Sequence, residues 1–385
     1  MAVSYVIEVS TAQELVNTLN SLSTTSIVVA SVSDYSDCTI RLTTDIDMNN
    51  SPYYSLDGNF FNFGMAAFTP EGESTTTRKP LIIDGDGHTI SNIYCFNRHT
   101  IFNIRQQWNG ANADRIYLKN ITIEAITNDA FMFWKATNYQ DPGLICDSVI
   151  FNVKMYSLSY GDTESGGALI DGRSCFVYFS GGDDGKLEFI NCIFNLFIMS
   201  TRLISDSLSS DGRIAVLFRG YGYTQWIASS QGIHFNGCIF KIRNQTNKNI
   251  FIVSYEGGNQ PSRFVFRNCG VFYNEIGPTQ PKYGYIDMWN YESGFCRQGR
   301  GNCTIDNSFV AAFGSLKEGF TRPIFIFSAS ASYTSNSFYD KDKIRGECNN
   351  TYDYNVSGTC AALTTEQCKD RDKLSEIGYI FCEES

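Results

Sequence analysis

The chain has 385 residues, with 40 acidic and 30 basic side chains, so its formal net charge is −10. This acidic balance argues against nonspecific binding to nucleic acid or to an anionic membrane, because both depend on an excess of Lys and Arg. Apolar residues make up 43% of the chain and include 29 Phe, which excludes a disordered polymer. No apolar run is long enough to span a bilayer, so no membrane insertion is expected, and residues 1–10 lack the segments of a secretory signal.

The first predicted element is an amphipathic helix within an N-terminal cap, residues 1–26. Ser10 and Thr11 are followed three residues later by Gln13 and Glu14, which gives two overlapping capping boxes. The apolar stripe that follows them consists of Leu15, Val16, Leu19 and Leu22. We expect a helix over residues 11–22 that covers the first coil of the next segment.

Residues 27–340 contain an internal repeat of short strands. Alternating apolar residues are followed by a bend residue, a small residue and a second apolar strand, and a further strand separates successive copies. The predicted bend residues are Asn120, Asp147, Asn191, Gly237, Asn268, Asn307 and Asn336. A tight bend needs a left-handed backbone, which Asn, Asp and Gly adopt at the lowest cost. The repeat therefore predicts stacked coils that bury one continuous core.

The residue after each bend is mostly small, and we expect these residues to form one interior column. They are Ile121, Ser148, Cys192, Cys238, Cys269, Ser308 and Ser337. The chain has 13 Cys, an odd number without any CxxC pair, and most lie in apolar runs. We expect buried, reduced thiols, because a chain made in the cytoplasm keeps its cysteines reduced.

The last predicted segment, residues 341–385, is a linker followed by a C-terminal cap. The run from Thr364 to Gln367 is typical of a helix start, and Gly378 is typical of a helix end. A second short helix over residues 364–377 is expected to cover the last coil.

The strand–Asn–small–strand element resembles that of the right-handed parallel β-helix family, which includes pectate lyases and phage tailspikes. Residues 81–90 and 40–48 resemble early coils of such proteins. The resemblance implies an all-β, right-handed parallel β-helix solenoid with a short capping helix at each end. It says little about activity, because this fold serves many functions.

Four aspartates are the candidates for catalysis, because enzymes of this family act on polysaccharides with grouped carboxylates. These candidates are Asp183, Asp184, Asp206 and Asp211. The sequence around Asp183 and Asp184 is also typical of a plain turn. The polygalacturonase-like and pectate-lyase-like motif sets are not complete, and no His or Cys spacing indicates a metal. We therefore expect no catalytic set, no metal and no cofactor.

Two irregular segments concentrate aromatic residues beside Gly and polar residues. The candidate binding residues there are Tyr221, Tyr223, Trp226, Tyr285, Trp289 and Tyr291. Such residues are common in ordinary cores and surfaces, at protein interfaces, and at sites where sugar rings stack. All three interpretations remain open from the sequence.

Irregular coils without a secretory signal or a catalytic set resemble a phage fibre or spike component. This resemblance implies synthesis in the host cytoplasm, a place on the virion, and a structural and adhesive function. The implied partners are other virion proteins, further copies in a homo-oligomer, and a bacterial surface glycan or receptor. The alternatives are a polysaccharide depolymerase, lyase or glycosidase, on the same fold, and a non-catalytic interaction scaffold.

Overall fold

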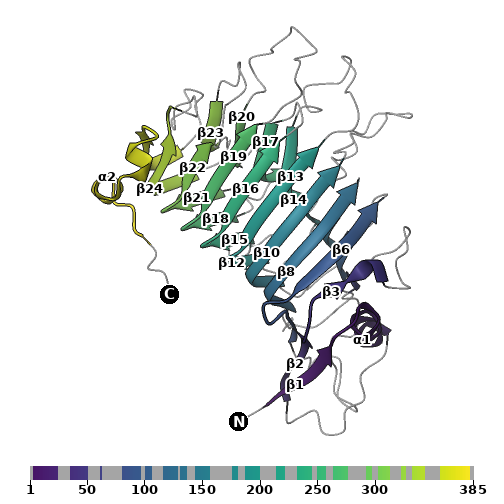
Figure 1. The fold of residues 1–385 in the computed structure, drawn as a ribbon. Helices are drawn as coiled ribbons and strands as arrows, with labels where there is room; N and C mark the ends of the chain where they lie inside the picture. Colours follow the sequence, from purple (N-terminus) through teal and green to yellow (C-terminus); the bar gives the residue numbers. More distant parts are fainter. Residues whose placement is uncertain are drawn as a thin grey trace, which may run out of the picture.

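The computed structural model is a stack of parallel β-strands with a helix near each end (Figure 1). It describes residues 3–24, 35–50, 61–62, 80–96, 100–105, 116–128, 131–136, 144–156, 176–180, 187–199, 214–221, 232–244, 249–256, 263–275, 292–296, 302–312, 322–326, 332–342 and 356–381. The expected all-β parallel β-helix solenoid is confirmed, because every strand pair in this part of the chain is parallel and links successive coils.

The described strands form two sheets, which we call the bent sheet and the closing sheet. The 17 strands of the bent sheet are β1 (Val3–Val9), β2 (Tyr35–Leu42), β3 (Ile46–Asp47), β5 (Leu81–Asp84), β6 (Thr89–Phe96), β8 (Ile116–Asn128), β10 (Leu144–Tyr156), β12 (Leu187–Ile190), β13 (Ile193–Met199), β15 (Gly232–Asn236), β16 (Ile239–Asn244), β18 (Arg263–Arg267), β19 (Gly270–Glu275), β21 (Asn302–Asp306), β22 (Phe309–Ala312), β24 (Ser332–Asp340) and β25 (Val356–Leu363). The eight strands of the closing sheet are β4 (Phe61–Asn62), β7 (Thr100–Arg105), β9 (Phe131–Ala136), β11 (Val177–Ser180), β14 (Ile214–Tyr221), β17 (Asn249–Glu256), β20 (Glu292–Cys296) and β23 (Arg322–Ile326). β1 and β25 thus extend the sheet into the segments assigned to the two caps.

Each coil crosses the bent sheet twice, before and after its bend, and the bends stack in register. Asn120, Asn191, Asn268, Asn307 and Asn336 have positive φ angles between 47° and 55°, and Gly237 has φ 67°. These are left-handed conformations, so the predicted bends are confirmed at these positions.

The prediction is wrong at Asp147, because the left-handed residue of that coil is Ser148, with φ 56°. Asp147 pairs with Lys119 and Val149 pairs with Ile121, which places Ser148 opposite Asn120. Ser148 is therefore exposed at the bend. The interior position that was predicted for Ser148 is occupied by Val149.

From Cys192 onward, the interior column closes the bends with side-chain hydrogen bonds. The thiols of Cys192 and Cys269 donate to the carbonyls of Ile190 and Arg267, two residues earlier, at 3.3 and 3.1 Å. In the later coils the Ser308 and Ser337 hydroxyls donate to the equivalent carbonyls, and the Ser308 hydroxyl also accepts the amide N–H of Cys269 at 3.0 Å. The carbonyls of Arg267 and Asp306 also accept backbone amides of the preceding coil. The Ser308 and Ser337 hydroxyls in addition provide acceptors for the buried amides of Cys269 and Ser308, which is what small polar side chains contribute here.

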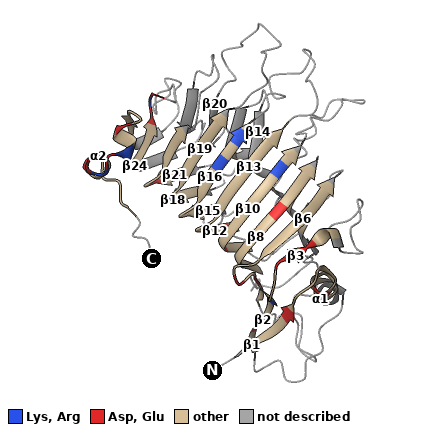
Figure 2. Cartoon of the chain, in the orientation of Figure 1, with Lys and Arg blue, Asp and Glu red and all other residues tan. Residues whose placement is uncertain are grey.

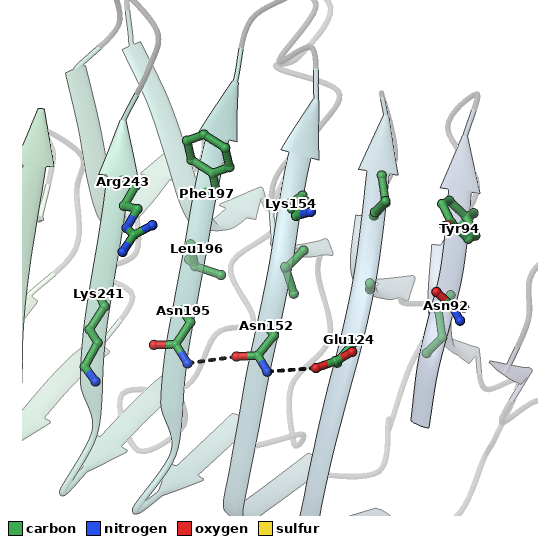
Figure 3. Close-up of a pocket in the computed structure, with 14 residues that line it drawn as sticks. Asn92, Tyr94, Glu124, Asn152, Lys154, Asn195, Leu196, Phe197, Lys241 and Arg243 are labelled. Atoms are coloured by element: carbon green, nitrogen blue, oxygen red, sulfur yellow. Dashed lines mark hydrogen bonds between the residues drawn. The ribbon is translucent and has the colours of Figure 1, made fainter. Parts of the chain in front are cut away.

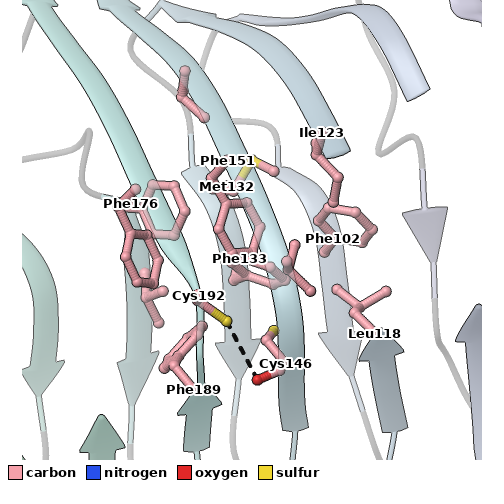
Figure 4. Packing of buried hydrophobic residues seen from close by; sticks show 14 of the residues in the cluster. Phe102, Leu118, Ile123, Met132, Phe133, Cys146, Phe151, Phe176, Phe189 and Cys192 are labelled. Carbon is pink, nitrogen blue, oxygen red and sulfur yellow. Dashed lines mark hydrogen bonds between the residues drawn. The ribbon is translucent and has the colours of Figure 1, made fainter. Parts of the chain in front are cut away.

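Phenylalanines fill the core between the two sheets (Figure 4). The Phe194 ring stacks on Phe151 and Phe240 of the adjacent coils, with centroid distances of 5.2 and 4.6 Å. Phe176 and Phe218, from the closing-sheet side, meet Phe194 edge-on. Stacking within a sheet and edge contacts between sheets are both favourable arrangements of aromatic rings, so the core is continuous from coil to coil.

The N-terminal helix α1 (Ala12–Thr24) covers the first coil as expected. Leu15, Val16 and Leu19 are buried in the main core cluster. One of the two predicted capping boxes forms: the Glu14 amide donates to the Thr11 hydroxyl, and the Glu14 carboxylate accepts the Thr11 amide.

The C-terminal cap is divided into a 3-10 turn, η4 (Gln367–Lys369), and a short helix, α2 (Arg371–Glu376), and the chain turns at Gly378 with φ 82°. A further 3-10 turn, η2 (Met48–Asn50), lies in an early coil. Leu374 of α2 packs with Phe338 and Leu363 in a cluster separate from the main core. The partly buried residues that pack against this cluster are Phe309, Ala361, Cys368, Ile377, Tyr379 and Phe381. The cap therefore covers the side of the last coils, whereas α1 joins the main core at the other end.

Candidate functional site

A groove with a volume of about 590 Å³ lies on the outer face of the post-bend strands β6, β8, β10, β13 and β16 (Figure 3). Side chains in a strand alternate between its two faces. Ala125, Val153, Leu196 and Ile242 are buried, and the residues on either side of each are at least partly exposed. The outward residues form two rows across the coils, which we call the amide row and the mixed row.

The amide row consists of Glu124, Asn152, Asn195 and Lys241, which are direct partners in the strand register. The Asn195 Nδ2 donates to the Asn152 Oδ1 at 2.8 Å, and the Asn152 Nδ2 donates to the Glu124 Oε1 at 3.4 Å. Each amide is oriented by its neighbour, so the row presents fixed donors and acceptors to solvent.

The mixed row lies two residues further along the same strands. It consists of Tyr94, Ile126, Lys154, Phe197 and Arg243. Phe197 is half-buried and stands in register between the exposed Lys154 and Arg243. The row thus alternates apolar contact surface with positive charge.

A β-bulge in β6 ends the groove on its N-terminal side. Between Ile90 and Ile93 the pairing with β8 slips by one residue, and Asn92 has a positive φ of 54°. The Asn92 Nδ2 donates to the Asp47 carboxylate at 2.9 Å. Bulges bend a strand and re-aim its side chains, so the groove has a defined end here.

Positively charged side chains outnumber negatively charged ones among the described residues that line the groove (Figure 2). Lys154, Lys241 and Arg243 form no ion pair with the rest of the described chain, and Glu124 is the one carboxylate among the lining residues. By contrast, Lys119 on the pre-bend face is paired with Asp84 at 3.2 Å. Among the described residues, the three cations of the groove therefore have no ion-pair partner.

Most candidate site residues from the sequence lie outside the described residues. These are Asp183, Asp184, Asp206, Asp211, Tyr223, Trp226, Tyr285, Trp289 and Tyr291. Tyr221 is the last residue of β14, and its backbone pairs with Ser180 and Glu256 in the closing sheet. None of the described residues that line the groove was a sequence candidate, so the groove is a site that the sequence analysis missed.

The described residues outside the groove offer little chemistry. Burial raises the pKa values of the Cys146, Cys192 and Cys238 thiols well above the usual range, so these groups are poor nucleophiles. Within the described ranges no three His, Cys, Asp or Glu side chains are placed to hold a metal ion. Nor does this part of the chain contain a helix with the length and apolarity to cross a membrane.

The fold and the groove define the class of the protein, an all-β parallel β-helix with a lateral groove lined by both polar and apolar side chains. No protein-family model matches the chain, and no curated protein matches it in sequence.

Proposed function

We propose that this protein is a non-catalytic adhesin that binds glycan along the lateral groove of a rigid β-helix. The observation that carries this proposal is the pair of in-register rows, which align two fixed amides, apolar surface and charged groups across successive coils. A glycan chain presents the same combination, with hydroxyl groups at the edge of each sugar ring and apolar C–H faces. A solenoid groove matches an extended polymer because both repeat along one axis.

The lining residues favour binding over cleavage. Hydrolysis of a glycosidic bond generally uses two carboxyl groups a defined distance apart, and among the described lining residues the groove offers one carboxylate, Glu124. The carboxylate of Glu124 already accepts a hydrogen bond from Asn152. Such a residue orients a ligand but has no second carboxylate with which to share acid and base roles.

The setting we propose is the one that the sequence resemblance suggests, a fibre or spike component of a phage virion that attaches to a bacterial surface. The continuous Phe core and the capped first coil support this proposal, because an adhesive rod must hold its binding face rigid against solvent on all sides.

A glycan array probed with the purified full chain tests the proposal. Asn152→Ala with Asn195→Ala, and Phe197→Ala, should each abolish or strongly weaken the array signal. Arg267→Gln, an exposed change on the pre-bend face of the same sheet, is the matched control and should bind like the parent. If Trp226→Ala or Trp289→Ala removes binding and the groove variants do not, the adhesive site lies in the aromatic segments and the groove proposal is wrong.

A further inference from the structure

We propose that the groove is specific for an acidic polysaccharide, whose sugar carboxylates are bound at Lys154 and at the pair formed by Lys241 and Arg243. This inference rests on the proposed function and names its ligand class.

The three cations are concentrated on a chain with a net charge of −10. An acidic polymer is repelled by the surface as a whole, but screening limits that repulsion to about 10 Å at an ionic strength of 0.1 M. The described residues that line the groove include three cations and one carboxylate. A neutral glycan would accept ordinary hydrogen bonds from them, whereas a carboxylate would gain stronger bonds between opposite charges.

Lys241 and Arg243 lie on one strand, two residues apart, and therefore on the same face. Arg243 belongs to the mixed row and Lys241 to the amide row, so the pair spans the width of the groove (Figure 3). A guanidinium binds a carboxylate through two parallel hydrogen bonds, and an ammonium beside it adds a point charge. This end of the groove is thus built for an anion.

The opposite end has the opposite charge. Glu124 lies three strands from Lys241 in the amide row, which is roughly 14 Å at the usual spacing of strands. It repels a carboxylate and accepts hydrogen bonds from sugar hydroxyls. The charge difference between the ends gives the bound polymer a preferred direction and position.

The third cation sets the spacing of the acidic groups. Lys154 lies two strands from Arg243 in the mixed row, with Phe197 between them. Two strand spacings are roughly 10 Å. The rise from one coil to the next is therefore about the length of one sugar unit in an extended polysaccharide. A polymer with a carboxylate on every second sugar would place one acid at Lys154, an apolar ring face at Phe197, and the next acid at Arg243.

The experiment is isothermal titration of the full chain with hyaluronate oligosaccharides, which carry a carboxylate on alternate sugars. The matched ligand is the same oligosaccharide with its carboxyl groups reduced to alcohols, which keeps the linkages and removes the charge. We expect the reduced ligand to bind at least tenfold more weakly.

Lys241→Gln with Arg243→Gln should cause a similar loss for the acidic ligand, because each charge-assisted hydrogen bond contributes about a factor of ten or more. Arg267→Gln should change neither.

Different results would contradict the acidic specificity and the glycan binding itself. If the reduced ligand binds as tightly as the acidic one, and Asn152→Ala still weakens both, the groove binds glycan but the acidic specificity is wrong. If neither ligand binds and the glycan array is also blank, the proposed function is wrong. If polyglutamate of similar length binds as tightly as the acidic oligosaccharide, the groove recognises polyanions in general, and the inference is overturned.

Discussion

Asn307 and Ile380 form a two-way hydrogen-bonded pair across the C-terminal end of the solenoid. The Asn307 Nδ2 donates to the Ile380 carbonyl at 2.7 Å, and the Ile380 amide donates to the Asn307 Oδ1 at 2.6 Å. The same Nδ2 also donates to the Asn268 side chain of the previous coil at 2.7 Å. The side chain of one bend residue thus ties the C-terminal cap to the stack of bends.

This relationship predicts that Asn307→Gly loosens the cap. Glycine keeps the left-handed backbone that Asn307 adopts, with φ 47°, but removes three hydrogen bonds from a buried site. We expect a loss of about 2–3 kcal/mol in the free energy of unfolding, at about 1 kcal/mol for each bond. Urea denaturation measures the loss, and hydrogen exchange should become faster in residues 371–381.

Asn191→Gly is the matched control. Asn191 is an exposed left-handed bend residue, with φ 51°, in a middle coil far along the chain from the cap. Its replacement should change stability by less than about 0.5 kcal/mol, as expected for a surface position away from caps and cores. Equal losses in the two variants would show that the cap contacts of Asn307 contribute nothing.

A second prediction concerns the bends themselves. Asn191→Val and Asn268→Val place a β-branched residue in a left-handed conformation, which should cost about 1–2 kcal/mol each. Glycine at position 191 adopts the left-handed backbone without strain. The difference in the free energy of unfolding between Asn191→Gly and Asn191→Val therefore measures the backbone strain. Valine variants that melt like the parent protein would contradict the bend assignment.

The fold was predictable because its signals are local and repeated. Left-handed bends favour Asn and Gly, and small residues follow them, so six of the seven predicted bend residues are confirmed. The failure at Asp147 has a physical origin, since Asp and Ser both occur at bends and only the pairing of Val149 with Ile121 decides between them. The position of the C-terminal cap was not predictable, because Leu374 packs against Phe338, a residue far from it in sequence.

The groove was missed because its residues show no motif along the chain. They emerge only when the coils are aligned on their true bends: the amide row lies four residues after Asn120, Ser148, Asn191 and Gly237. With Asp147 as the marker, that coil contributes Phe151 and Val153 in place of Asn152 and Lys154, and the rows disappear. The two rows are thus visible in the sequence only when Ser148, rather than Asp147, is taken as the bend residue of that coil.

A third prediction concerns catalysis by the candidate aspartates. The purified chain, incubated with glycans that it binds, should release no new reducing ends and no unsaturated oligosaccharides. Release that disappears with Asp183→Asn or Asp206→Asn, but persists with the exposed pre-bend variant Arg267→Gln, would establish a depolymerase. That outcome would replace the adhesive proposal.

The last prediction concerns the pH dependence that the interior thiols impose on stability. Burial raises the pKa values of Cys192 and Cys238 well above those of exposed thiols, whereas in the unfolded chain a thiol has a pKa of about 8.5. Below that pH the thiols are protonated in both states, so their contribution to stability is complete. As the pH rises beyond it, the unfolded chain releases protons that the folded chain retains, and the free energy of unfolding falls by up to about 1.4 kcal/mol per pH unit for each thiol.

Urea unfolding at about pH 7.5 and about pH 9.5, on either side of the thiol pKa of the unfolded chain, measures this effect. Cys192→Val is the matched variant, because Val149 occupies the equivalent interior position in the neighbouring coil. Every other titrating group is common to both proteins, so the parent should lose more stability between the two pH values than the variant does.

Cys192, Cys238 and Cys269 should also resist alkylation in the native protein and react once it is unfolded without reductant. An equal pH dependence in both proteins, or a peptide that links Cys192 to Cys238 in a non-reduced digest, would show that these residues are not the buried thiols of a reduced core.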